Sequence, residues 1–285
     1  MKHHELLRLA PLWAIHPSAL AAILSLEAKP FQAAKPSTMG RGANKVAVVP
    51  IQGVLASGSQ YGTSYEAIQN AVEAAANDPA VKHIVLSVDS PGGNVTGLPE
   101  TAATIAAAAR IKPVTAMVEG MAASAAYWLA SQASKVVITP SGEVGSVGVR
   151  MMHVDVTKAM DEAGYKVTEM HAGDFKTEWS PFSPLSDGAK AAMQTRLDAS
   201  HQDFLAAVKT GRGSRATQDI TDKRFGEGRM FDGQEAAAHG LVDAVQSSRD
   251  FYRSVTPAAE AEPITAPTFP IGPARARLEV ERARF

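Results

Sequence analysis

The feature that most constrains this chain is an alternation of short apolar runs with longer amphipathic segments between residues 45 and 139. Four valine-rich runs have the composition of buried strands: 45–51, 83–88, 113–118 and 135–139. Three longer segments carry apolar residues at helical spacing: 65–76, 96–111 and 121–133. Strands that alternate with helices in this way form a mainly parallel sheet with helices packed outside it, so we expect an α/β fold.

Two loops stand out because each directly follows a predicted buried strand. They span residues 89–94 and 119–125, and both are rich in glycine or other small residues. The carboxyl ends of parallel strands share one edge of the sheet, and ligands bind at that edge in open α/β proteins. The sequence therefore predicts a site where these two loops meet.

The chain beyond residue 140 is predicted to continue with shorter elements. In order they are a glycine-punctuated segment at 143–149, a strand near 151–154, a helix at 157–163, a strand at 166–170, an irregular loop at 171–185, a long helix after Ser186 and a helix at 233–239. Ser186 is a suitable N-cap for the long helix, which we expect to end near Gly211.

We divide the chain into three parts. Residues 1–43 are predicted to form one or two short amphipathic helices, split by Pro17, and then a linker rich in proline and glycine. Residues 44–248 form the α/β domain. Residues 249–285 are rich in proline and alanine, and we expect a low-complexity, disordered tail whose last residues could form a short charged helix.

Composition excludes several classes of chemistry. The 285-residue chain has no cysteine, so disulfides, thiolate catalysis and cysteine-based zinc sites are excluded. A formal net charge of −1 provides no field that would attract nucleic acid or an anionic membrane. No phosphate-binding loop, dinucleotide fingerprint or His-Glu-x-x-His motif is present, so we expect no cofactor and no metal. We see neither a secretory signal nor a membrane span, and expect a cytoplasmic protein without a membrane anchor.

The stretch from Val118 to Ala130 is the first candidate for chemistry. A buried strand reaches Gly120, after which Ser124 stands among alanines before an aromatic pair. Small residues let backbone and substrate approach closely, and a serine at the start of a helix lies near free backbone N–H groups. The alternative is that these small residues only permit tight packing, and this stretch alone leaves both readings open.

A serine becomes a nucleophile only when another group accepts its proton, and two residues are candidates for that base. His153 lies in a strand-like segment and, with Asp155 as its carboxylate, would complete a Ser-His-acid triad. Lys176 lies between Phe175 and Trp179, and burial among aromatic residues would favour a neutral amine. The residues alone also allow a hydrogen-bonded strand histidine and a solvated loop lysine.

Acyl transfer also needs backbone N–H groups that point at the developing oxyanion. The segment Ser90-Pro-Gly-Gly93 suits this role, because proline sets the entry to the turn and the two glycines leave their amides unobstructed. The alternative is an ordinary β-turn after a buried strand.

Two motifs in order, Asp89-Ser-Pro-Gly-Gly93 and Gly120-Met-Ala-Ala-Ser-Ala-Ala-Tyr127, resemble those of the ClpP/crotonase superfamily. Within it the chain resembles the signal peptide peptidase A (SppA) family of serine proteases, and most closely its phage branch, the protein C-type capsid (prohead) maturation proteases. Three further segments support this resemblance: Gly145-Ser-Val-Gly-Val149, Ala172-Gly-Asp-Phe-Lys176 and Gly228-Arg-Met-Phe-Asp-Gly233. The resemblance covers about 45–247.

The resemblance implies a ClpP/crotonase-like fold of ββα-type units and a serine endopeptidase with a Ser/Lys dyad. It also implies roles for six residues: Ser124 as nucleophile, Lys176 as general base, Ser146 as the residue that orients the lysine, the amides of Gly93 and Ala125 as oxyanion hole, and Gly92 as the residue that shapes the turn. Family members form rings or domes, so we expect a homo-oligomer in which the lysine can come from a neighbouring subunit.

The resemblance also suggests substrates. A phage or prophage head-maturation protease would act on scaffold, portal or capsid proteins, and on itself. The first alternative is a bacterial SppA-like peptidase that degrades signal peptides or proteins. A crotonase-like acyl-CoA enzyme is a more distant alternative, in which the glycine loop holds a thioester oxyanion and Ser124 is not a nucleophile.

Overall fold

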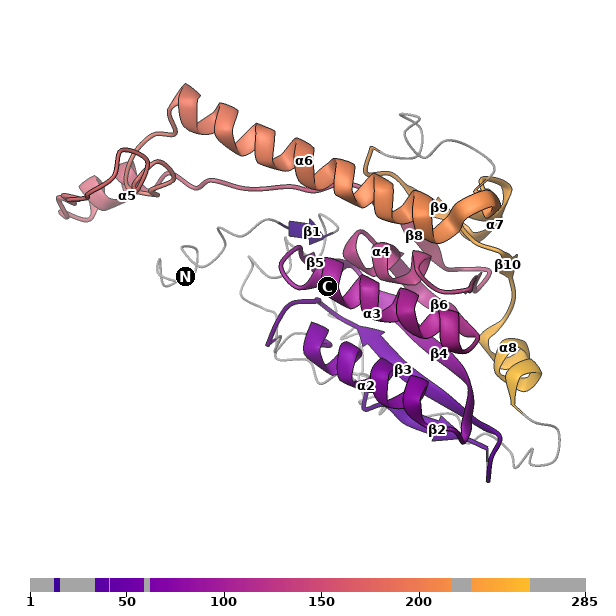
Figure 1. The fold of residues 1–285 in the computed structure, drawn as a ribbon. Coiled ribbons are helices and arrows are strands. Elements are labelled where there is room, and N and C mark those ends of the chain that lie inside the picture. The colour runs from indigo at the N-terminus through magenta and orange to yellow at the C-terminus, as the bar shows by residue number, and fades with distance from the viewer. Residues whose placement is uncertain (1–12, 16–33, 41, 59–61, 217–226, 257–285) are drawn as a thin grey trace, which may run out of the picture.

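The computed structural model describes residues 13–15, 34–40, 42–58, 62–216 and 227–256 of the chain. Within these residues the predicted α/β architecture is confirmed, since helices pack on an eight-stranded and mostly parallel sheet (Figure 1). The N-terminal and C-terminal helices predicted before residue 13 and after residue 256 lie outside the described residues.

Four neighbouring parallel strands form the centre of the sheet: β3 (Lys45–Gln52), β4 (Val81–Ser90), β6 (Val114–Ala123) and β7 (Lys135–Ile138). Their sequences are almost continuously apolar because helices cover both faces, as is usual for parallel sheets. All four strands were predicted from the sequence, although β6 extends five residues beyond the predicted end at 118.

Shorter strands extend the sheet at its edges. β2 (Ser37–Met39) pairs antiparallel with β3, and β10 (Ala244–Val245) pairs parallel with β7. β8 (Glu143–Gly145) pairs parallel with the carboxyl end of β6, and β9 (Met230–Asp232) pairs antiparallel with β8. β8 and β9 thus continue the sheet at the end where β6 finishes.

Helices cover the two faces of the sheet unequally. α2 (Tyr65–Asn77), α3 (Leu98–Ile111) and α4 (Ala125–Ser131) contribute to one large apolar core with residues such as Leu86. The opposite face has a smaller cluster, in which Phe251 of α8 (Ser248–Val255) packs with four sheet residues: Val46, Val85, Met117 and Val137. The short helix α7 (Gly233–Ala238) was predicted at 233–239.

The long helix α6 (Asp187–Arg212) is fixed to this body through its C-terminal half. Ser186 caps its N-terminus as predicted, because the serine hydroxyl accepts the Ala189 N–H at 3.1 Å. Near the other end, Phe204 stacks on Trp128 of α4 with ring centroids 4.8 Å apart. This contact gives α6 its orientation across the helical layer (Figure 1).

An ion pair between the buried Arg212 and Asp243 holds the last turn of α6. Arg212 is fully buried, and its two Nη atoms donate to the carboxylate oxygens of Asp243 at 2.9 and 2.7 Å. Its Nε donates to the Gly240 carbonyl at 3.0 Å, and Asp243 also accepts the Val136 N–H of β7 at 2.6 Å. Each of the three guanidinium nitrogens thus has an acceptor, as a buried charge requires.

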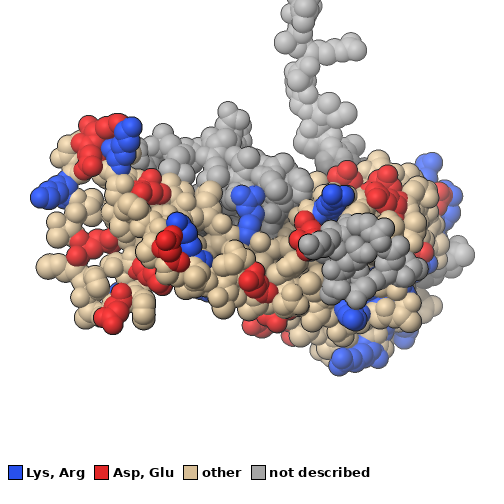
Figure 2. Space-filling view, turned by 90° about the horizontal axis from the view of Figure 1, so that it is seen from above, with Lys and Arg blue, Asp and Glu red and all other residues tan. Residues whose placement is uncertain are grey.

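Residues 157–186, which we call the arm, lie beyond the N-terminal end of α6 (Figure 1). The arm begins with α5 (Thr157–Glu162) and continues through turns without regular structure. Four of its large apolar residues are exposed: Tyr165, Val167, Met170 and Phe175. Figure 2 shows acidic and basic side chains interspersed on the upper face, including the arm at the left.

Six predicted assignments are wrong. Residues 151–154 and 166–170 are not strands. Three segments are strands instead of what was predicted: 121–123 belong to β6 rather than to a helix, 37–39 form β2 rather than a linker, and 13–15 form β1 rather than a helix. Residues 249–255 belong to helix α8 rather than to a disordered tail. Strand formation depends on a neighbouring edge, which local periodicity does not report. The body accordingly begins before residue 44 and continues past residue 248.

Candidate active site

Ser124 lies between the last residue of β6 and the first residue of α4, at a sharp turn from strand to helix. Its N–H donates to the Gly145 carbonyl at 2.8 Å, and its own carbonyl accepts the Trp128 N–H at 3.0 Å. The side chain is only 1 % exposed, and its hydroxyl donates to the Gly148 carbonyl at 3.3 Å. Alanines on both sides are fully buried, so small residues at this turn are required by the packing.

The turn is strained at two serines. Among the described residues, Ser124 (φ 56°) and Ser146 (φ 52°) are the non-glycine residues with positive φ. Such conformations cost about 1–3 kcal/mol each and persist only where the surroundings enforce them. Here the enforcing contacts are backbone hydrogen bonds, from Ser124 N–H to Gly145 and from Ser146 N–H to Arg229, the latter at 2.6 Å.

The sheet explains why these two serines are neighbours. Ala123 and Gly145 lie opposite each other in the parallel pair β6–β8, and the strained serines are the next residue of each strand. Adjacent parallel strands that end at the same level present their following residues side by side. The structure therefore brings together Ser124 and Ser146, which the resemblance assigned to one site.

The glycine loop lies at the same edge. β5 (Gly92–Asn94) follows β4, and Ser90 of β4 pairs with Ala122 of β6 two residues before the nucleophile candidate. The Ser90 hydroxyl donates to the Gly53 carbonyl at 2.6 Å and accepts the Gly92 N–H at 3.1 Å. The turn is thus held by a side chain of the motif itself.

Both glycines are required by geometry. Gly92 has φ 96°, which disfavours any residue with a Cβ, so its predicted role in shaping the turn fits the observed backbone. At Gly93 an added Cβ would overlap the carbonyl oxygen of Leu55, whose backbone runs alongside β5. The motif therefore encodes a close approach of two backbone segments as well as a turn.

The direction of the Gly93 N–H follows from the strand pattern. Leu55 N–H donates to the Gly92 carbonyl at 3.0 Å, and Asn94 N–H donates to the Leu55 carbonyl at 2.8 Å. Backbone groups of successive strand residues point to opposite sides, so the Gly93 N–H points away from Leu55. The Ala125 N–H opens helix α4 and has no intrahelical acceptor. These are the two N–H groups assigned to the oxyanion hole.

Two supporting residues were not assigned a role from the sequence. The Asp89 carboxylate accepts the Met121 N–H at 3.1 Å and so ties the glycine loop to the strand before Ser124. Tyr65 is fully buried and donates to the Asn94 carbonyl at 2.5 Å. Burial raises the pKa of the Tyr65 phenol, which therefore stays protonated as a donor. Asp89 opens the recognised motif, whereas nothing local in the sequence marks Tyr65.

The base candidates are placed differently from Ser124. Lys176 is exposed, on a turn of the arm in which its N–H donates to the Gly173 carbonyl at 3.1 Å. The arm precedes Asp187, the start of α6, and the contact of α6 with α4 is at Phe204, about 26 Å further along the helix. Within one chain the structure does not bring Lys176 to Ser124.

His153 is also engaged elsewhere. Its Nε2 lies 2.9 Å from the Ser180 carbonyl, which belongs to the arm. The Asp155 carboxylate accepts the Thr157 hydroxyl and the Thr157 N–H at the start of α5. Hydrogen bonds from the Thr157 side chain and backbone lower the pKa of Asp155. These two residues therefore fasten the arm and form no triad with Ser124 in this chain.

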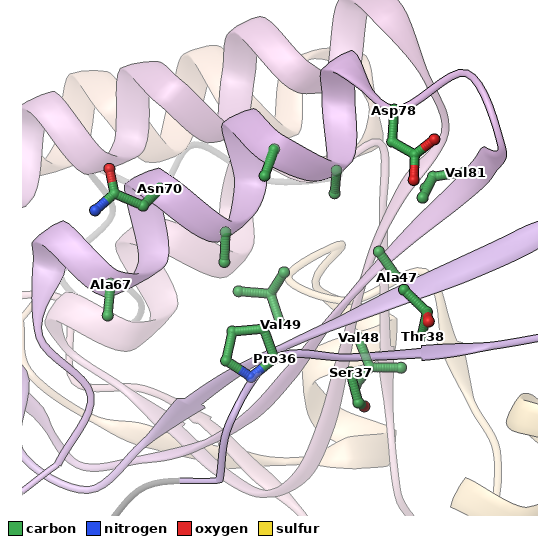
Figure 3. A pocket seen from close by; sticks show the side chains of 13 residues that line it. Pro36, Ser37, Thr38, Ala47, Val48, Val49, Ala67, Asn70, Asp78 and Val81 are labelled. Atoms are coloured by element: carbon green, nitrogen blue, oxygen red, sulfur yellow. The ribbon is translucent and has the colours of Figure 1, made fainter.

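A separate hollow of about 560 Å³ lies between α2 and strands β2 and β3 (Figure 3). Its lining is mostly alanine and valine, and Asp78 is the one ionisable side chain among the lining residues. The Asp78 carboxylate already accepts the Ala80 N–H at 2.8 Å. The hollow holds no set of groups for catalysis.

The part of the chain that the structure describes has no group of three or more histidine, aspartate or glutamate side chains placed to hold a metal ion. Across the described ranges no helix is long and apolar enough to cross a membrane.

Comparison with known proteins identifies the family. The model of peptidase family S49 matches residues 106–262, which is more than half of the chain and includes the turn at Ser124 and the arm. The chain belongs to peptidase family S49.

Family S49 relatives include proteins of phages and of cellular organisms. The capsid assembly protease C of Escherichia phage lambda is 35 % identical over 224 residues, covering 76 % of this chain and 50 % of that protein. The head-tail preconnector protein GP5 of Enterobacteria phage P21 is 31 % identical over 225 residues, covering 76 % and 44 %. A putative signal peptide peptidase SppA of Enterococcus faecium is 27 % identical over 181 residues, covering 62 % and 51 %. The chain spans about half the length of these relatives.

Solved structures with a similar fold were also found. A mutant of the 1510-N membrane-bound stomatin-specific protease, in complex with a substrate peptide, has a TM-score of 0.46 at 14 % identity and covers 74 % of this chain and 83 % of that one. An enoyl-CoA hydratase/isomerase family member has a TM-score of 0.45 at 14 % identity, covering 80 % and 74 %.

Proposed function

We propose that this chain is a serine endopeptidase in which Ser124 is the nucleophile. The observation that carries the proposal is the strained Ser124 at a strand-to-helix turn, beside the N–H groups of Gly93 and Ala125. Nucleophilic serines of other α/β hydrolases also stand on a sharp, strained turn from strand to helix. A role in packing alone would not require this strain.

We propose that Lys176 of a neighbouring protomer is the general base. Lys176 is exposed on the arm of its own chain, and the arm has exposed apolar residues at Met170 (95 %) and Phe175 (78 %). An exposed apolar group of this kind is typical of an interface. Burial of the amine between two protomers would favour its neutral form and so allow it to accept a proton.

The reaction then has two steps. Ser124 Oγ attacks the carbonyl carbon of the substrate while the Lys176 amine accepts the hydroxyl proton, and the carbonyl oxygen takes negative charge facing Gly93 and Ala125. The C–N bond breaks as the lysine returns the proton to the leaving amine, which leaves an ester on Ser124. Water, deprotonated by the same lysine, hydrolyses this ester. Ser146, the strained neighbour of Ser124, is proposed to orient the lysine.

The proposed substrates are capsid, portal or scaffold proteins of a phage or prophage. The support is the 35 % identity to the capsid assembly protease C of phage lambda over 76 % of this chain. The alternative is a bacterial peptidase that degrades signal peptides or other proteins, supported by the similarity to the putative SppA of Enterococcus faecium. A crotonase-like enzyme is less well supported, because it would use no nucleophilic serine and the strained backbone at Ser124 would then have no function.

A fluorophosphonate probe tests the nucleophile and a mixing experiment tests the base. Wild-type protein should be labelled, whereas Ser124→Ala should not, and Lys176→Ala should lose both labelling and peptide cleavage. If the lysine acts from a neighbour, an equal mixture of the two inactive variants, unfolded and refolded together, should regain about a quarter of wild-type activity. No recovery would place both groups in one chain, and full labelling of Ser124→Ala would refute the nucleophile.

A further inference from the structure

The edge of β5 that faces away from Leu55 is paired with another strand of the same chain. β1 (Trp13–Ile15) pairs antiparallel with β5, and the two strands form a separate sheet of their own. The register places Trp13 opposite Asn94, Ala14 opposite Gly93 and Ile15 opposite Gly92. β1 lies beside β5 in Figure 1. A segment more than seventy residues away in sequence thus lies on the loop assigned to the oxyanion hole.

The backbone pattern identifies which residue faces the Gly93 N–H. The inner edge of β5 uses the Gly92 carbonyl and the Asn94 N–H for Leu55, so the outer edge presents the N–H and carbonyl of Gly93. Ala14 is the residue directly opposite, and in an antiparallel ladder such a pair exchanges both of its backbone hydrogen bonds. The Ala14 carbonyl therefore takes the place in which a substrate carbonyl would meet this donor.

We propose that residues 13–15 occupy the peptide-binding edge of the active site in a substrate-like register, with Ala14 at the position of the residue before the scissile bond. This rests on the proposed peptidase function and adds a regulation to it, since a peptide must displace β1 to bind. It also names the substrate class: an extended chain that adds a strand to β5 and carries a small residue at the cleaved position.

The length of β1 makes displacement feasible. The pairing covers three residues, and Pro11 and Pro17 flank it in the sequence, where proline has no N–H to donate to a longer ladder. A substrate peptide without prolines at the corresponding positions keeps these N–H donors. The internal segment is thus a competitor that a longer peptide can replace.

The experiment measures peptide binding in full-length Ser124→Ala protein, which cannot cleave the probe. The probe is a fluorescein-labelled peptide that copies residues 8–20 of this chain, and fluorescence anisotropy gives its dissociation constant. Adding Ala14→Pro removes the Ala14 N–H and disrupts the pairing, so we expect about tenfold tighter binding, as when an occupied site becomes free. Ala10→Pro is the matched control, because residue 10 is outside the pairing, and it should bind like the parent.

Three outcomes would overturn the proposal. They are equal affinity of all three proteins for the peptide, equally tighter binding by both proline variants, and no binding by any of the three. Amide hydrogen exchange provides a second measurement that does not depend on the probe. Gly93 should be protected in the Ser124→Ala parent and should exchange faster when Ala14→Pro is added. Failure of the proposed function is recognised separately, because chain with Ser124 intact would then not react with the fluorophosphonate.

Discussion

The turn at Ser124 and the arm differ in almost every physical respect. At the turn, residues on both sides of Ser124 are fully buried, and each strained backbone group is held by a hydrogen bond of 2.6–2.8 Å. In the arm, residues 161–176 are exposed, and the part that follows α5 has no regular structure up to the turns that contain Lys176. The nucleophile is therefore fixed by its own chain, whereas the proposed base is supplied by a segment that its own chain leaves uncovered.

This difference teaches that one chain contains all the parts of the proposed site but completes only half of it. A preorganised nucleophile and oxyanion hole need a rigid scaffold, because catalysis by oriented dipoles depends on fixed geometry. The base needs to arrive only when another protomer is present. If the base comes from a neighbour as proposed, activity depends on assembly.

The largest effect on stability is expected at the C-terminal end of α6, where Arg212 pairs with Asp243. Arg212→Met removes the three hydrogen bonds that the fully buried guanidinium donates, two of them to Asp243, and leaves the partly exposed carboxylate with Arg215 at 4.0 Å and the Val136 N–H. This should cost about 2–4 kcal/mol of unfolding free energy in urea titrations. Arg253→Met is the control, since its pair with Asp250 is solvent-exposed, and it should cost below about 1 kcal/mol. Similar losses of unfolding free energy in both variants would show that the Arg212–Asp243 pair contributes no more than an exposed ion pair.

Glycine substitutions compare β5 with the start of α6. Gly93→Ala places a Cβ on the Leu55 carbonyl, so we expect a loss of about 1–3 kcal/mol in stability. Fluorophosphonate labelling should also slow by about 10²–10³-fold, the usual effect of losing an oxyanion donor. Gly188→Ala, at the start of α6, meets only the Ser186 hydroxyl at 3.9 Å and should leave stability and labelling unchanged or slightly improved. Equal tolerance at both positions would contradict the close approach at Gly93.

Acid should weaken the ion pair that holds the C-terminal end of α6. Burial alone would raise the pKa of Asp243, but hydrogen bonds from Arg212 and from the Val136 N–H hold it below its ordinary value of 3.8. The folded form thus binds this proton less readily than the unfolded form, so its stabilisation is complete above pH 3.8 and is lost as the pH falls below that value. Urea titrations between pH 5 and pH 2, in steps of about half a unit, should show a smaller acid-induced loss in Asp243→Asn. An identical pH profile would exclude Asp243 as the source.

The smallest effect on folding is expected in the arm. Phe175→Ser removes an exposed side chain, so the unfolding free energy should change by less than about 0.5 kcal/mol. Labelling of Ser124 should nevertheless fall, and size-exclusion chromatography should show a shift toward smaller species. Unchanged oligomeric state and labelling would mean that this part of the arm does not contact another protomer.

The sequence predicted the central sheet well because buried parallel strands are continuous apolar runs, as in 45–51 and 83–88. It also placed Ser124, Gly92 and Gly93 at one edge, since all of them follow such strands. Strands β1 and β2 were missed because their formation depends on a neighbouring edge, which local composition does not encode.

Sequence spacing could not show where the proposed base lies. The residues alone left open whether Lys176 is buried among aromatic residues or exposed on a loop, and the structure shows it exposed on the arm. Adjacency in sequence to Phe175 does not imply contact, because turns direct neighbouring side chains apart. The assignments of Ser124, Lys176, Ser146, Gly93 and Ala125 to catalysis remain predictions until they are tested.

The geometry of α6 has a mechanical consequence. The helix is clamped near Phe204 and Arg212 and extends about 26 Å from Phe204 to the start of the arm, so it acts as a lever with one fixed end. A rotation of about 5° at the clamp moves the free end by about 2 Å, close to the length of one hydrogen bond. If Lys176 serves a neighbouring protomer as proposed, small rotations of α6 would thus be enough to bring the lysine into reach of that serine, or to withdraw it.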